Sequence, residues 1–241
     1  GLTCLDAATG RMTHYLSDPL DECSLPVGEV LALAPGAGGG LWVGTAGGLG
    51  LLDVGTGRTR QYRFDFGDGG KSPSMAVSAV TETATGHVWV GTQHRGALQL
   101  DLETGRWRSF ANDPQDPASL SDNEVYSLMM DRAGVLWIGS SNGANRLDTK
   151  AKQFFHISNQ GSSEARLSNA CVWSMWETRD RKLWIATESG LNILDPTTGL
   201  IHQVWADPDD PNRPSYDSFI EVVEDSLGGI WLGARDGALN R

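Results

Sequence analysis

One short phrase recurs five times in this chain of 241 residues: a tryptophan set between aliphatic residues and followed by glycine or alanine and a small polar residue. Its first copy is LWVGTAGG at 41–48. The tryptophans are Trp42, Trp89, Trp137, Trp184 and Trp231, which lie 47, 48, 47 and 47 residues apart. Periods of this size are typical of repeat folds, and about this length makes one four-stranded blade of a β-propeller.

Each repeat contains four short segments with the residue pattern of strands. The first is apolar, as in EVYSLMM at 124–130, and the tryptophan phrase is the second. The third ends in Leu-Asp, as at 147–148, where we expect the aspartate to cap the next turn; the fourth is polar with aromatic residues. We expect the tryptophans to be buried between blades and the following glycine to let the chain turn. The sequence therefore predicts an all-β fold, a β-propeller of four-stranded antiparallel blades.

The two ends of the chain hold incomplete repeats. Residues 1–16 have the pattern of a third and a fourth strand, and 217–241 that of a first and a second. If these strands share one blade, the chain is a single domain, 1–241, and no sheet edge stays open. Its five blades are then 1–16 plus 217–241, 26–64, 75–111, 122–159 and 169–206. The alternative is an open or partial segment of a larger propeller, because GALNR at 237–241 resembles the start of a further third strand.

The composition argues against several classes of function. The formal net charge of −11 argues against nucleic acid and anionic membrane surfaces as partners. No apolar run reaches the length of a transmembrane helix, so we expect no membrane insertion by this segment. No nucleophile or zinc motif occurs, so we expect no catalytic residue, no metal and no cofactor. We interpret the cysteines as structural thiols, with a bridge between the first two as the alternative; they are Cys4, Cys23 and Cys171.

The up-and-down order of the strands predicts where a site lies. The long links between blades and the turns from second to third strand fall on one face, where loops commonly bind ligands. The candidate ligand-binding residues at the tips of these turns are His94, Arg95, Asn142, Glu188, Arg235 and Asp236. The starts of the innermost strands add Glu29, Asn123, Tyr126, Trp173 and Ser218. Of these, Tyr126 and Trp173 are ligand-binding candidates because two aromatics could stack on a sugar ring; packing between blades is their alternative role.

The repeats resemble those of the two-component regulator propeller family. The match is strongest in SLSDNEVYSLMMDRAGVLWIGSSNGANRLD at 119–148, and the preceding loop NDPQDPASL at 112–120 also fits. The resemblance implies the sensor propeller of a bacterial membrane-anchored receptor, in the periplasm or outside the cell. It also implies that an output kinase or cyclase lies outside this chain, and that a carbohydrate is one kind of ligand such propellers sense.

Three functions remain open on this basis. The first is a ligand-binding sensor in signal transduction, with an oligosaccharide or another small ligand as partner. The second is a protein-interaction scaffold without a small ligand, which docks a sister propeller or a second receptor subunit. The third is an enzyme, such as a propeller lyase or a glycoside hydrolase, although we expect no enzymatic activity from the propeller itself.

Overall fold

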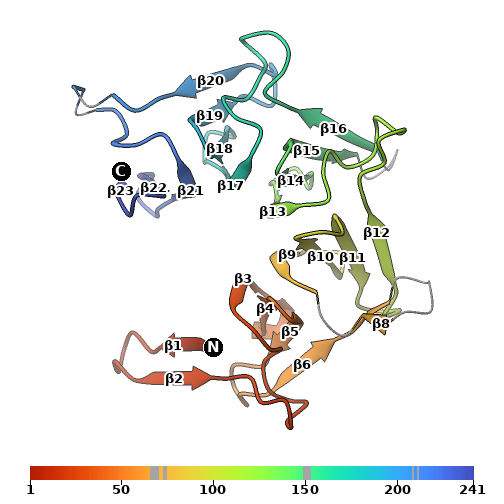
Figure 1. The fold of residues 1–241 in the computed structure, drawn as a ribbon. Coiled ribbons are helices and arrows are strands. Elements are labelled where there is room, and N and C mark those ends of the chain that lie inside the picture. Colours follow the sequence, from red (N-terminus) through yellow and green to blue (C-terminus); the bar gives the residue numbers. More distant parts are fainter. Residues whose placement is uncertain (66–70, 73–74, 149–152, 208, 211) are drawn as a thin grey trace. The chain divides into compact units, whose positions relative to one another are not determined.

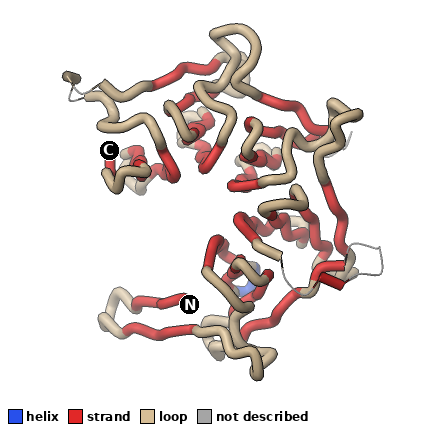
Figure 2. Tube along the Cα trace, viewed as in Figure 1, coloured by secondary structure: helices blue, strands red, loops and turns tan. Residues whose placement is uncertain are grey.

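The computed structural model describes residues 1–65, 71–72, 75–148, 153–207, 209–210 and 212–241. The chain divides into two compact units, residues 1–110 and residues 111–241, and every sheet lies within one of them. Both units consist of strands and loops (Figures 1 and 2). The one helical element in the described part is a 3-10 turn, Ala37–Gly39, so no described helix has the length needed to cross a bilayer.

The first unit holds two four-stranded antiparallel sheets (Figure 1). One sheet consists, in spatial order, of β3 (Val30–Pro35), β4 (Leu41–Thr45), β5 (Gly48–Leu52) and β6 (Thr59–Tyr62). The other consists of β9 (Val77–Glu82), β10 (His87–Thr92), β11 (Ala97–Asp101) and β12 (Trp107–Phe110). Two short hairpins accompany them: β1 (Leu2–Leu5) with β2 (Met12–Tyr15), and β7 (Phe64–Asp65) with β8 (Lys71–Ser72).

The second unit repeats this arrangement. Its first sheet consists of β13 (Val125–Met130), β14 (Leu136–Ser140), β15 (Gly143–Asp148) and β16 (Gln153–Ile157). Its second sheet consists of β17 (Val172–Glu177), β18 (Leu183–Thr187), β19 (Leu191–Leu194) and β20 (Ile201–Val204). A three-stranded sheet follows, made of β21 (Phe219–Glu224), β22 (Ile230–Ala234) and β23 (Leu239–Asn240).

These sheets confirm the predicted all-β propeller of four-stranded antiparallel blades. Four of the five blades have all four strands, two blades in each unit, and the fifth blade is the three-stranded sheet β21–β23. In that blade β23 pairs with β22, Leu239 opposite Gly233, which is the third strand expected from GALNR. That the two ends of the chain share a blade, and that 1–241 forms one domain, stay predictions.

Three of the five repeat tryptophans, Trp42, Trp89 and Trp137, are buried as predicted, whereas Trp184 and Trp231 are partly exposed. Trp42 has no exposed surface and lies in a core with Val77 and Val80 of β9. Trp137 lies in a second core with Val172 and Met175 of β17. Burial of such large apolar side chains contributes about 1.5–3 kcal/mol each.

The glycine after the tryptophan has a different role from the one predicted. Gly44 and Gly139 lie inside strands β4 and β14, so neither of them forms the turn. A Cβ on Gly44 would come within 2.6 Å of Val77, and one on Gly139 within 2.7 Å of Val172. The glycine is therefore needed because the first strand of the next blade approaches the backbone closely.

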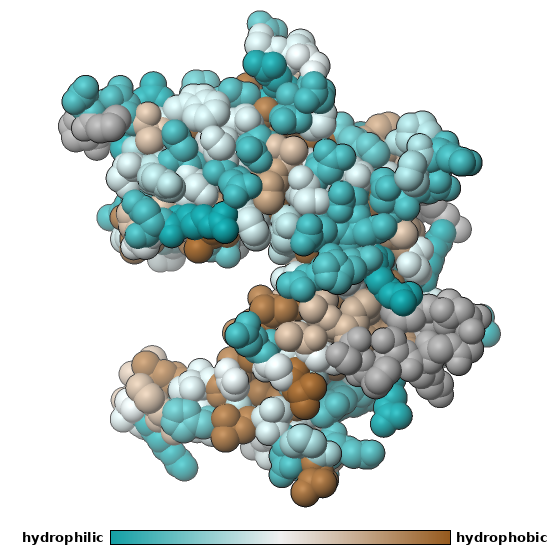
Figure 3. Space-filling model, in the orientation of Figure 1, coloured by the Kyte–Doolittle hydropathy of each residue, from teal (hydrophilic) through white to brown (hydrophobic). Residues whose placement is uncertain are grey.

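Hydrophobic surface is spread unevenly over the chain. On the face shown in Figure 3, brown hydrophobic patches gather over the first unit, whereas most of the second unit is teal. The exposed apolar side chains of the first unit include Leu5, Met12, Leu16 and Leu20, on or beside the β1–β2 hairpin.

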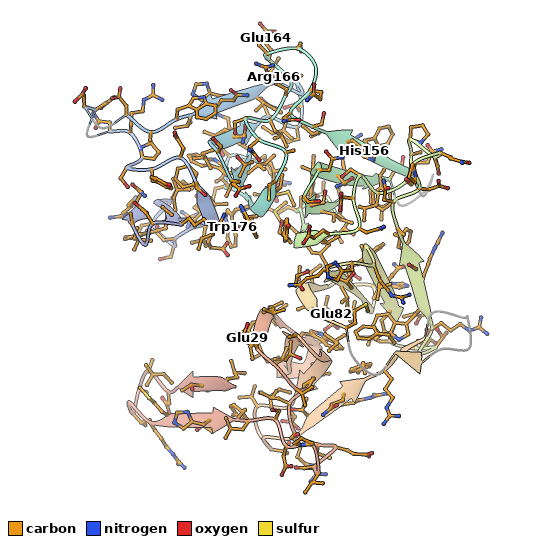
Figure 4. The ribbon with its side chains drawn as sticks, in the orientation of Figure 1. Glu29, Glu82, His156, Glu164, Arg166 and Trp176 are labelled. Atoms are coloured by element: carbon orange, nitrogen blue, oxygen red, sulfur yellow. The ribbon has the colours of Figure 1, made fainter. Side chains whose placement is uncertain are left out.

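A glutamate at the end of a first strand joins neighbouring blades in three places. Glu82 of β9 accepts the backbone N–H of Ala37 at 2.9 Å and the indole N–H of Trp42 at 2.6 Å (Figure 4). Glu177 accepts the backbone N–H of Arg132 at 2.8 Å in the same way. Glu224 and Arg179 repeat this pair at 2.9 Å, so the contact is a property of the repeat.

Candidate functional site

Backbone hydrogen bonds hold each turn tip against the start of its own first strand. In the second unit, the tip residues Glu188 and Arg235 donate their N–H groups to the carbonyls of Cys171 and Ser218, at 3.1 and 3.0 Å. In the first unit, Ala46 donates to Glu29 at 2.9 Å (Figure 4). Within each unit, turn tips and strand starts therefore lie side by side, as the strand order predicted.

A buried hydroxyl group fixes the shape of these turns. Thr187 closes the β18–β19 turn by donating to the carbonyl of Gly190 at 2.6 Å, and Ser140 does the same for Gly143 at 3.0 Å. Both hydroxyl side chains are fully buried. The turn tips are thus rigidly placed, although the side chains they carry are exposed.

Each first strand has a β-bulge at the same register position. On β13, Val125 pairs with Ser140 and Ser127 with Gly139, which leaves Tyr126 outside the ladder. On β17, the same shift leaves out Trp173. A bulge re-aims the side chain of its extra residue and is common beside binding sites. The bulge positions of the five blades are Leu31, Ser78, Tyr126, Trp173 and Ile220.

The two aromatic bulge residues contact each other. The rings of Tyr126 and Trp173 stack with centroids 4.4 Å apart and an interplanar angle of 29°. Both side chains are half-buried. Burial raises the pKa of Tyr126 above its ordinary value, and a hydrogen bond to the Glu124 side chain raises it further. The phenol therefore stays neutral throughout the physiological pH range.

A charged pair from two turn tips lies beside this stack. The Arg235 guanidinium carbon is 5.7 Å from the centroid of the Trp173 ring, a cation–π distance. Its Nη1 atom donates to Glu188 Oε1 at 2.9 Å. The side chains of Arg235 and Glu188 are 56% and 49% exposed, so their ion pair adds little stability and is free to rearrange.

Cys171 lies in the same cluster, and the charged side chains around it shift the pKa of its thiol. Burial raises the pKa of its thiol to about 11, and the nearby carboxylates of Glu188 and Glu124 add to this, opposed by Arg235. The thiol is free and stays protonated at neutral pH. Beside this thiol, the two carboxylates of Glu188 and Glu124 face the single guanidinium of Arg235.

Two buried polar atoms near this cluster have no partner among the described residues. They are Nε1 of Trp173 and Oγ of Ser218. A buried donor or acceptor without a hydrogen bond costs about 1–3 kcal/mol. Both atoms are enclosed, so a partner from another molecule reaches them only when neighbouring side chains move.

The other predicted site residues of the second unit make contacts within their own blades. Asp236 accepts the backbone N–H of Ala238 at 2.9 Å, and Asn142 donates to the carbonyl of Ser121 at 3.4 Å. His94 and Arg95 are exposed on the β10–β11 turn of the first unit. The cluster thus contains Tyr126, Trp173, Glu188 and Arg235 of the predicted set, and their role in ligand binding stays a prediction.

Sequence reasoning missed Glu124 and the position of Cys171. Glu124 directly precedes β13, where the matched position on β17 is Cys171 itself. Comparison of the five strand starts could have found both, but their proximity to Glu188 and Arg235 depends on packing between blades.

The first unit contains a groove whose position recurs in other repeats. It has a volume of about 840 Å³ and lies beside β5 and β6, with Asp53, Arg58 and Arg60 in its lining. Grooves of about 360 and 550 Å³ occupy matched places beside β12 and β20. In the described part of the chain, no group of three His, Cys, Asp or Glu side chains is arranged to hold a metal ion.

Comparison with known proteins identifies the repeat. The family described as two component regulator propeller matches residues 119–142, which hold the start of β13, its bulge and the tryptophan strand β14. The match covers one repeat of the chain, so this stretch is similar to a two component regulator propeller repeat. No curated protein matches the sequence.

Solved structures resemble this propeller over nearly its whole length. The extracellular domain of BT3049 from B. thetaiotaomicron, described as a hybrid two component system, is 26% identical with a TM-score of 0.82; the match covers 99% of this chain and 30% of that one. The extracellular domain of BT4673 from the same organism is 18% identical with a TM-score of 0.66, over 95% of this chain and 34% of that one. The propeller thus spans about a third of these relatives.

An enzyme also shares the fold. A catalytically inactive virginiamycin B lyase from Staphylococcus aureus, solved with quinupristin, is 15% identical with a TM-score of 0.65. The match covers 99% of this chain and 75% of the lyase. At this identity the likeness concerns the propeller fold alone.

Proposed function

We propose that this chain is the ligand-binding part of an extracytoplasmic sensor in a bacterial signalling receptor, and that it binds a carbohydrate at the cluster of Tyr126, Trp173, Glu188 and Arg235. The location is supported by two similar structures, both of them extracellular domains; that of BT3049 is described as part of a hybrid two component system. The propeller then binds the carbohydrate without catalysing a reaction on it, and any output activity belongs to other parts of the receptor.

The stacked pair at the bulges is the observation that carries this proposal. Flat aromatic faces bind the apolar C–H face of a sugar ring, and Trp173 offers the larger one. Glu188 stands beside it with a planar acceptor that suits adjacent hydroxyl groups, and its exposed ion pair with Arg235 can open to a ligand. Both come from rigid turn tips, so the site is largely preformed.

Trp173→Ala tests the site. We expect oligosaccharides that stabilise the wild-type protein against heat to lose this effect in the variant, because a ligand stabilises only the state it binds. Thermal shift and titration calorimetry against an oligosaccharide panel measure it. The matched control is Trp176→Ala, three residues further along β17, whose side chain is 37% exposed (Figure 4).

Two results would contradict the proposal. One is a ligand whose binding survives Trp173→Ala, which places its site elsewhere. The other is a panel without any stabilising saccharide, combined with concentration-dependent self-association or binding to a second receptor subunit. That combination would favour the scaffold function.

A further inference from the structure

Arg235 occupies the place that a cationic ligand group would take. Its guanidinium lies 5.7 Å from the Trp173 ring centroid and donates to Glu188 at 2.9 Å. An aromatic face together with a carboxylate is the arrangement that recognises ammonium groups. The arginine comes from an exposed turn tip of the neighbouring blade, so a ligand can displace it at small cost.

The charges around the aromatic pair favour a cation over an anion. Glu124 and Glu188 both raise the pKa of Cys171, and Glu124 and Asp122 both raise that of Tyr126. Arg235 opposes the effect of these carboxylates on the pKa of Cys171, and its guanidinium is already paired with Glu188. A ligand carboxylate or sulfate would meet net negative charge here.

The unpartnered polar atoms would gain hydrogen bonds from a ligand that also carries oxygen and reaches them once neighbouring side chains move. The indole N–H of Trp173 is a donor without an acceptor among the described residues. The hydroxyl of Ser218, on a residue only 8% exposed, is also without a partner there, and its backbone carbonyl binds the N–H of Arg235. Ring and hydroxyl oxygens of a sugar would supply the missing hydrogen bonds.

We propose that the site binds a saccharide bearing a free, protonated amine, and that this ammonium group displaces Arg235 from Trp173 and Glu188. This inference rests on the proposed function and narrows its ligand class to amino sugars. Arg235 then competes with the ligand: it pairs with Glu188 while no ligand is bound, and the ligand's ammonium group takes its place on Glu188.

Removal of Arg235 tests the proposal, because the proposal predicts tighter binding where a role for Arg235 in holding the ligand predicts weaker binding. Calorimetric titration with a glucosamine trimer should show binding, and Arg235→Ala should tighten it about threefold, because the competing cation is gone. Glu188→Gln should weaken it about tenfold. The control for net charge is Arg213→Ala, which removes another exposed arginine, paired with Asp210, and should change the affinity much less.

Three further probes separate this inference from the function on which it rests. They are the N-acetylated trimer, a galacturonic acid trimer and 1,5-diaminopentane. Tighter binding of either the neutral or the acidic trimer, or loss of binding in Arg235→Ala, overturns the amine inference while the carbohydrate function stands. Binding of the diamine alone, sensitive to Glu188→Gln, keeps the ammonium site and overturns the carbohydrate. Absence of binding by all four probes overturns the amine inference.

Discussion

At the scale of single residues, Glu82 shows a contact that no local pattern reveals. Its two donors, Ala37 and Trp42, lie 45 and 40 residues earlier in the chain, on the preceding blade. The period places the glutamates at matched positions, but the hydrogen bonds depend on how neighbouring sheets pack. In β3 and β13 the same register position holds Pro35 and Met130, so those strands carry no such carboxylate.

Glu82→Ala should lower the free energy of unfolding by about 1–3 kcal/mol, because it leaves the indole N–H of the fully buried Trp42 without an acceptor. Urea unfolding followed by tryptophan fluorescence measures the change. Glu103→Ala, on an exposed turn, is the control and should stay within about 0.5 kcal/mol of the wild type. Equal effects of the two changes would show that the contact between the blades is not stabilising.

The turn aspartates were predictable residue by residue. Asp53 and Asp101 each accept two backbone N–H groups of their own hairpin turn, as the Leu-Asp and Thr-Gly pairs indicated. Asp6 and Asp195 do the same. These contacts lie within three residues of the aspartate, which is why a short motif is enough to predict them.

At the scale of elements, the bulge is what sequence reasoning could not supply. Matched positions identified Tyr126 and Trp173, yet the residue left outside the ladder depends on the register with the second strand. The glycine of the tryptophan phrase was misinterpreted for a similar reason. Its neighbour Val77 comes from the next blade, and a turn residue and a close-packed residue look alike in one sequence.

Gly44→Ala should therefore destabilise the first unit by about 1–3 kcal/mol, since the added Cβ would overlap Val77. Gly233→Ala provides the matched control on β22. A Cβ there would lie 3.6 Å from Glu221, which is ordinary contact. Thermal unfolding of both variants checks the difference. A smaller cost at Gly44 than at Gly233 would contradict the close approach between β4 and β9.

At the scale of the whole molecule, the period of 47 residues was enough to predict the fold, because each repeat encodes the same four strands. The candidate site was predictable in part. The strand order placed turn tips beside strand starts, but the grouping of Glu188 and Arg235 with the aromatic pair arises from three different blades.

Acid stability is also a property of the whole repeat array. The pKa of Asp225 is lowered from 3.8 to about 2, first by the indole N–H of Trp231 and then by backbone N–H groups. The turn aspartates also have lowered pKa values; they are Asp6, Asp53, Asp101 and Asp195. Since these folded-state values lie below the unfolded ones, the stability they add is complete above the unfolded pKa and is lost as the pH falls through the folded value.

The melting temperature should consequently fall steeply between about pH 4 and pH 2. Thermal melts followed by circular dichroism over a pH series measure this acid limb, the part of the curve of melting temperature against pH that falls at low pH. Asp225→Asn should lower the melting temperature at pH 7 and flatten the limb, because the substituted side chain no longer titrates. An acid limb identical in variant and wild type would show that Asp225 contributes nothing to it.

The five bulges have a consequence for how propellers of this kind diverge. The extra residue of each bulge lies outside the strand ladder, so replacing it changes what the surface offers while the strand register stays the same. Leucine, serine, tyrosine, tryptophan and isoleucine already occupy the five copies of this position. Duplication of a blade thus copies the scaffold and frees one side chain to drift, and new ligand preferences can evolve, or be engineered, without redesign of the fold.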